Sequence, residues 1–213
     1  MKKVFSFCFL AFIFTFSVNF FGCGTENLCD NVVELRKDVF SGDYNGVPLH
    51  ASYGYKVIDG YKNYSLSFIL PFDKVVGTTS VRVVYNEQDY NAVFALSEVT
   101  GNYLARLNIE DFNVNSFDCT ITVGSEHTVV NMVSDVPNGA CDYKKAVEFL
   151  QKNQPELVDL YRENGIFSAN LIVRVIGKEG KCYYYIGIEK GGNLKALLID
   201  GFSGEVLAIR DIK

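Results

Sequence analysis

The chain has no tryptophan, only two histidines and no extended run of basic residues. Lys and Arg together number 20 and Asp and Glu 25, which gives a net charge of -5. A protein that binds nucleic acid needs a basic surface to neutralise phosphates, and the sequence offers no such patch. We therefore expect no nucleic-acid partner.

The scarcity of histidine also limits the chemistry that the chain can perform. A serine or cysteine hydrolase would have to use His50 or His127 as its base, and neither lies in a metal-binding pattern such as HExxH. The stretch Gly201–Glu205 nearly spells a nucleophile elbow, but Glu205 stands where that motif requires glycine, which indicates a turn. We expect no catalytic, cofactor-binding or metal-ligating residues.

Cysteines are few and widely spaced, so a CxxC zinc or redox motif is excluded. Cys8 lies in the leader described next, and the cysteines of the mature chain that could form disulfides are Cys29, Cys119, Cys141 and Cys182. Four cysteines allow three connectivities, of which we favour Cys29 with Cys119 and Cys141 with Cys182. Buried free thiols are the alternative.

An apolar leader opens the sequence. Lys2 and Lys3 precede an uncharged, phenylalanine-rich run that ends at Gly22 and Cys23. This end resembles the lipobox of bacterial lipoprotein signals, although Phe20 and Phe21 replace the usual leucine and small residue. The resemblance implies a lipid on Cys23. The alternatives are an ordinary signal peptide and an uncleaved membrane anchor. All three place the body outside the cytoplasm, either membrane-anchored on the extracytoplasmic side or secreted.

After the leader (residues 1–23) and a tether with a first strand (residues 24–40), residues 41–135 read as β-structure. Segments rich in Val, Ile, Tyr, Phe and Thr alternate with turn signals such as Asn45-Gly46 and Asp59-Gly60. We expect an antiparallel β-sandwich of immunoglobulin-like architecture, without the Cys-Trp-Cys signature. The predicted strands are His50 to Val57, Tyr64 to Leu70, Ser80 to Tyr85, Asn91 to Leu96, Tyr103 to Ile109, Cys119 to Val123 and Thr128 to Met132.

The pattern changes near residue 140, and residues 140–213 read as a small α+β domain. Asp142 is a candidate N-cap, Pro155 begins a second helical stretch and Gly165 is positioned to close it, which predicts one kinked helix or two short ones. Short links then predict an antiparallel meander. Its expected strands are Ser168 to Ile176, Cys182 to Ile188, Leu194 to Ile199 and Glu205 to Ile209.

The last hairpin of this domain, from Ala196 to Leu207, consists of an apolar run, Asp200, turn residues, Gly204 and a further strand. A helix followed by such a meander resembles the PepSY-type modules of bacterial envelope and secreted proteins. The resemblance covers roughly the last 70 residues. It implies a non-catalytic module that occurs alone at the cell envelope or accompanies secreted peptidases as an inhibitory prosegment.

Both faces of the predicted meander are apolar, because Leu171, Val173 and Val175 point to one face and Ile172 and Ile176 to the other. One helical layer covers only one of them. The second face must meet the β-domain, a neighbour near the lipid or a partner protein. Packing against the β-domain is the commonplace use of such a face.

Two functions are compatible with these observations. The favoured one is an exported, lipid-anchored envelope protein that binds a protein or peptide partner without catalysis, for example a peptidase that it modulates. The alternative is an extracellular hydrolase of a surface polymer that uses carboxylates of the β-domain. That chemistry requires two carboxylates facing each other across a cleft, about 5 to 10 Å apart.

Overall fold

The computed structural model describes residues 26–71 and 77–212. These residues form a mainly β-structure with two short helices, which confirms the expected predominance of strands. The leader, with its predicted lipid site at Cys23, lies outside the described residues. Among the described residues, none of the helices has the length and apolar character that a bilayer crossing demands.

The part before residue 140 begins with the 3-10 helix η1 (Leu28–Asn31) and continues with nine strands. The strands are β1 (Val32–Tyr44), β2 (Val47–Ile58), β3 (Tyr61–Leu70), β4 (Thr79–Tyr85), β5 (Gln88–Val93), β6 (Ala95–Leu96), β7 (Tyr103–Leu107), β8 (Ser116–Val123) and β9 (Glu126–Ser134).

The part after residue 140 carries both α-helices, a small hairpin and a four-stranded meander. These elements are α1 (Tyr143–Asn153), α2 (Pro155–Asp159), β10 (Arg162–Glu163), β11 (Ile166–Phe167), β12 (Asn170–Lys178), β13 (Lys181–Lys190), β14 (Asn193–Asp200) and β15 (Val206–Ile212). The helix pair and the antiparallel meander agree with the sequence prediction.

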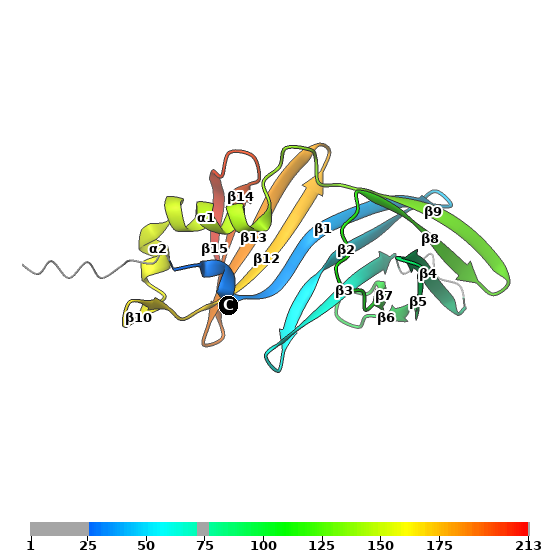
Figure 1. Ribbon diagram of the computed structural model, residues 1–213, viewed down its shortest axis with the longest axis horizontal. Helices are drawn as coiled ribbons and strands as arrows, with labels where there is room; N and C mark the ends of the chain where they lie inside the picture. The colour runs from blue at the N-terminus through cyan, green and yellow to red at the C-terminus, as the bar shows by residue number, and fades with distance from the viewer. Residues whose placement is uncertain (1–25, 72–76, 213) are drawn as a thin grey trace, which may run out of the picture.

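One long strand, β1, joins the two parts into a single sheet. Along one edge it pairs with β2 over most of its length. Along the other edge it pairs first with β12, from Val32 to Arg36, and then with β9, at Phe40 and Ser41. The pairing with β12 is parallel and brings together segments about 140 residues apart. Figure 1 shows β1 running from beneath the helices into the strands of the other part.

Strands β1 to β9 curve round into a nearly closed antiparallel sheet. One path from β1 runs through β2, β3, β7 and β6, and the other through β9, β8, β4 and β5. The two paths meet in the chain at Phe94, whose N–H donates a hydrogen bond to the carbonyl of Thr79 at 2.9 Å. The expected immunoglobulin-like sandwich is therefore not confirmed, because all the described strands except β10 and β11 belong to one continuous sheet.

The helices cover one face of the meander. The carboxylate of Asp142 accepts a hydrogen bond from the N–H of Lys145 at 2.9 Å, as expected of an N-cap. Ala146, Val147 and Leu150 recur at helical spacing and are buried against the sheet. Figure 1 shows α1 lying across β12 and β13. The prediction for Gly165 was wrong: α2 ends at Asp159, and Gly165 occupies the turn between β10 and β11 with φ 81°.

Two hydrophobic cores result, and β1 and β2 contribute to both. The first core lies between the helices and the meander, where Leu171, Val173 and Val175 are at most 1% exposed. The second fills the nearly closed sheet and contains Phe40 and Tyr53. Because β1 and β2 contribute to both cores, these strands fix the positions of the two cores relative to each other.

Candidate functional site

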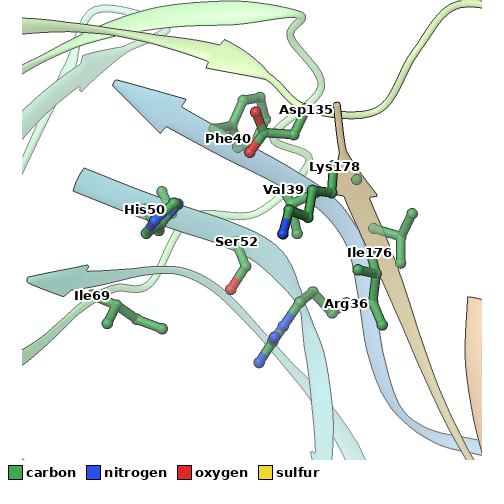
Figure 2. A pocket seen from close by; sticks show the side chains of 12 residues that line it. Arg36, Val39, Phe40, His50, Ser52, Ile69, Asp135, Ile176 and Lys178 are labelled. Atoms are coloured by element: carbon green, nitrogen blue, oxygen red, sulfur yellow. The ribbon is translucent and has the colours of Figure 1, made fainter. Parts of the chain in front are cut away.

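A cleft opens where β12 separates from β1. It has a volume of about 330 Å3 and lies at the junction of the two parts of the sheet. Its lining residues come from β1, β2, β3, the end of β12 and the segment after β9. They are Arg36, Val39, Phe40, His50, Ala51, Ser52, Ile69, Asp135, Val175, Ile176, Gly177 and Lys178, most of which Figure 2 labels.

The topology explains why the cleft forms at this place. The edge of β1 that pairs with β12 up to Arg36 pairs with β9 from Phe40 onward, so the two partner strands diverge between these residues. The chain leaving β9 crosses the end of β12, and the N–H of Asp135 donates to the carbonyl of Val39 at 2.9 Å. A Cβ at Gly177 would lie only 2.2 Å from the carbonyl oxygen of Asp135. Glycine is therefore required for this close approach.

Arg36 occupies the wall formed by β1. Its side chain is half-buried, and burial lowers the pKa of the guanidinium from its ordinary value, with a further contribution from Arg174. Arg36 and Arg174 are directly paired residues of β1 and β12, so both belong to the same face of the sheet. The guanidinium remains charged at neutral pH, because the ordinary pKa of arginine lies far above 7.

The carboxylate of Glu34 partly offsets the lowering of the Arg36 pKa, but it is bonded to Arg174. Glu34 accepts a hydrogen bond from Nε of Arg174 at 2.8 Å and lies 2.7 Å from Nη2 of the same residue. The Arg174 guanidinium also stands 5.7 Å from the ring centroid of Tyr185. Within residues 26–71 and 77–212, Arg36 itself has no hydrogen bond or ion pair. The carboxylate of Glu34 therefore bonds to Arg174 and acts on Arg36 only through its charge.

The remaining polar groups of the cleft include one further cation, Lys178, and one carboxylate, Asp135. Lys178 is exposed at the end of β12, and its ammonium group lies 3.8 Å from a carboxylate oxygen of the similarly exposed Glu179. His50 is exposed on β2. Of the residues that the structure describes, Asp135 is the one carboxylate lining the cleft, and it accepts a hydrogen bond from the hydroxyl of Ser41 at 2.6 Å. The cleft therefore combines apolar side chains with an excess of cations.

The four cysteines predicted to form disulfides are free thiols in the structure. Cys29 packs against the core beneath the helices, whereas Cys119 is buried in the core of the nearly closed sheet. Cys141 and Cys182 both contact Gly201: the N–H of Cys141 donates to the carbonyl of Gly201, and the N–H of Gly201 donates to that of Cys182, each at 2.8 Å.

The other residues considered as sites lie apart from the cleft or serve as turns. His127 lies on β9, where its Nδ1 is 2.9 Å from the hydroxyl of Thr122. The carboxylate of Asp200 accepts hydrogen bonds from the N–H groups of Phe202 and Ser203, so the Gly201–Glu205 stretch contains a turn, as expected. Among the described residues, no three His, Cys, Asp or Glu side chains are grouped to hold a metal ion.

Sequence reasoning considered His50 only as a base that a hydrolase would need and predicted no site there, and it missed Arg36 and Lys178 altogether. Both belong to segments that read simply as strand and turn. Their proximity depends on the parallel pairing of β1 with β12, for which the sequence contains no local signal.

Comparisons of the chain with protein-family models, with characterised proteins and with solved structures find no match.

Proposed function

We propose that this protein is an exported, lipid-anchored envelope protein that binds a protein or peptide partner without catalysing a reaction. The observation that carries the proposal is the cleft beside Arg36, because it is continuous with an uncovered apolar face of the meander. In this proposal the protein acts by binding a partner through its surface, and one example of such binding is the modulation of a peptidase.

The apolar face lies opposite the helices. Strand register places Ile172 and Ile176 of β12 on the same face as Tyr183 and Tyr185 of β13, and Leu198 of β14 continues the row. Arg174, whose charge is paired with Glu34, lies between the two isoleucines on this face. These side chains are half-buried or exposed, and Ile176 is 42% exposed. The helices lie on the other side of this sheet (Figure 1). Antiparallel sheets that face water normally carry polar residues, so a partner is the physical use for this surface.

The cleft extends this face beyond β12. Arg36 is paired with Arg174, and Ser52 and Ile69 follow on the outer surfaces of β2 and β3. A segment bound along this path would contact Ile176, pass Arg36 and reach Ile69. Ligand sites are commonly concave, mostly apolar and supplied with a few polar groups that fix orientation.

The leader supports the location part of the proposal. A lipid on Cys23 would hold the folded body at the membrane surface, a few residues from η1. We also propose that the part before residue 140 is a β-domain of sandwich-like architecture. The part after residue 140 is, in this proposal, a PepSY-like module. Mass spectrometry of the mature N-terminus tests the anchor, because lipid on Cys23, an end at Thr25 and an intact Met1 differ in mass.

Selection from a displayed library of random peptides, with the full-length protein in detergent, tests the binding function. Selected peptides are expected to slow hydrogen exchange of backbone amides in β2 and β12. The change Ile176→Lys should abolish their binding by placing an ammonium group on the apolar path. Val129→Lys is the matched control, since Val129 is a 66% exposed strand residue outside the cleft. Failure to select peptides, or equal binding by both variants, would overturn the proposed function.

A further inference from the structure

The charges around Arg36 are unbalanced in a way that points to a ligand. Glu34 and Arg36 lie two residues apart on β1, and Arg174 faces them from β12. Glu34 is held by Arg174 through contacts of 2.7 and 2.8 Å. In the part of the chain that the structure describes, the half-buried Arg36 is left with neither a hydrogen bond nor an ion pair.

An unpaired guanidinium in this setting has a strong preference for an anion. Its five N–H donors form a planar fork that matches a carboxylate, and charge-assisted hydrogen bonds of this kind are about twice as strong as neutral ones. Partial burial removes some of the water that would otherwise solvate the charge. Lys178 lines the same cleft and adds a second cation.

The cleft itself cannot supply the missing carboxylate in its present arrangement. Among the described lining residues Asp135 is the one acidic residue, and its carboxylate accepts a hydrogen bond from the Ser41 hydroxyl at 2.6 Å. Figure 2 shows Asp135 at one side of β1 and Arg36 at the other end of the cleft. An anion that pairs with Arg36 would therefore come from outside the cleft.

The position of Arg36 indicates how the anion is presented. Apolar side chains lie on both sides of it, with Ile176 of β12 on one side and Ile69 of β3 on the other. A chain terminus bound at Arg36 would use only one of these sides. An acidic side chain in the middle of an extended apolar segment uses both.

We propose that the cleft binds an extended peptide segment whose internal Asp or Glu carboxylate pairs with Arg36, while flanking apolar residues contact Ile176 and Ile69. This inference rests on the proposed function and names the class of partner. It assigns to Arg36 the recognition of acidic, apolar segments and to Lys178 a supporting charge at the rim.

Three N-acetylated heptapeptides test the inference by isothermal titration with the full-length protein in zwitterionic detergent. The first is acetyl-Ser-Leu-Val-Glu-Leu-Val-Ser-amide, the second has Gln in place of Glu, and the third has Gln and a free C-terminal carboxylate. We expect the Glu peptide to bind about tenfold more tightly than either Gln peptide, as one charge-assisted hydrogen-bond pair implies. The change Arg36→Gln should remove this difference.

Arg210→Gln is the control, because Arg210 is an exposed arginine of β15 on the same face of the sheet. It should leave the tenfold preference intact, and thermal unfolding should show that both variants are folded. Equal binding of the Glu and Gln peptides, absence of binding by all three, or equal affinity for the free C-terminus would overturn the inference. The inference would also be overturned if phosphatidylglycerol vesicles bound in an Arg36-dependent way and displaced the Glu peptide. The selection from a random peptide library, which tests the proposed function, does not require the peptides to be charged. Its outcome is therefore independent of the test of this inference.

Discussion

The phenol oxygen of Tyr53 accepts a hydrogen bond from the backbone N–H of Phe112 at 3.1 Å in the core of the nearly closed sheet. Tyr53 is 1% exposed and Phe112 fully buried, and their rings are in contact, with centroids 5.4 Å apart. The bond fixes the loop after β7 to β2 and satisfies a backbone donor that water does not reach.

Tyr53→Phe is expected to reduce the free energy of unfolding by about 1–3 kcal/mol, because the N–H of Phe112 would lose its acceptor. Urea denaturation followed by circular dichroism measures this loss. Tyr61→Phe is the matched control, since Tyr61 is 76% exposed and its change should have an effect within about 0.5 kcal/mol. Equal stabilities of the two variants would mean that the buried hydrogen bond is unimportant.

Asp142→Ala should destabilise the protein by about 1 kcal/mol, because the N–H of Lys145 loses its capping partner at the start of α1. Asp142→Asn should retain most of the stability, since its amide oxygen can accept the same bond. The two variants can be compared by thermal unfolding. If Asn were as damaging as Ala, the carboxylate would act through its charge rather than as a cap.

The sequence correctly predicted local structural features, namely turns, a helix cap and the alternation of side chains along a strand. Asn45-Gly46 and Asp59-Gly60 form turns as expected, with φ values of 53° and 79° for the first pair, and Asp142 caps its helix. The alternation of Leu171 and Ile172 between two faces is also confirmed by burial. These features depend on neighbouring residues, so a single sequence is sufficient to find them.

The arrangement of these pieces could not be predicted in the same way. Leu35 pairs with Tyr55 nearby in sequence but also with Val173, and nothing in either segment specifies the second, parallel pairing. Closure of the sheet at Phe94 likewise depends on packing of the whole core. The cleft forms where one edge of β1 changes its partner from β12 to β9. The sequence does not reveal this change of partner, so Arg36 could not be recognised as a site residue.

Stability should fall as the pH rises above about 9. Burial raises the pKa of Cys119 to about 12, of Cys182 to about 11 and of Tyr55 to about 12, so their neutral forms are favoured in the folded state. The unfolded chain releases these protons at lower pH, about 8.5 for cysteine and 10 for tyrosine. The stabilising contribution is therefore complete below about pH 8.5 and is lost as the pH approaches the folded values. Urea midpoints at pH 8, 9.5 and 11 measure the decline.

The cysteine variant Cys119→Ala provides the control for this pH dependence. It should be less stable than the parent at pH 8 because it leaves a small cavity, but its stability should decline less steeply between pH 9.5 and 11. A parent protein whose unfolding midpoint stays constant over this range would contradict the assigned pKa values.

Under oxidising conditions Cys141 should pair with Cys182 rather than Cys29 with Cys119. The first two residues both bond to the backbone of Gly201, whereas the second two contact different cores. A disulfide requires Cα atoms within about 7 Å, so cysteines in separate cores cannot join without rearrangement. Peptide mapping without reduction, on protein purified with its thiols blocked, identifies the pairs. Recovery of a Cys29–Cys119 peptide from native protein would contradict this prediction.

Gly177→Ala should alter both stability and the cleft. The new Cβ would lie 2.2 Å from the carbonyl oxygen of Asp135, so the end of β12 and the segment after β9 must move apart. Overpacking of this kind costs about 1–3 kcal/mol of unfolding free energy, measurable by urea denaturation. Because Val175 to Lys178 form one wall of the cleft, peptides selected for binding should also lose affinity. Ile176→Val, which removes one methylene from a 42% exposed neighbour, should change stability much less. If Gly177→Ala kept full stability and peptide affinity, the close approach of Asp135 to β12 would not determine the shape of the cleft.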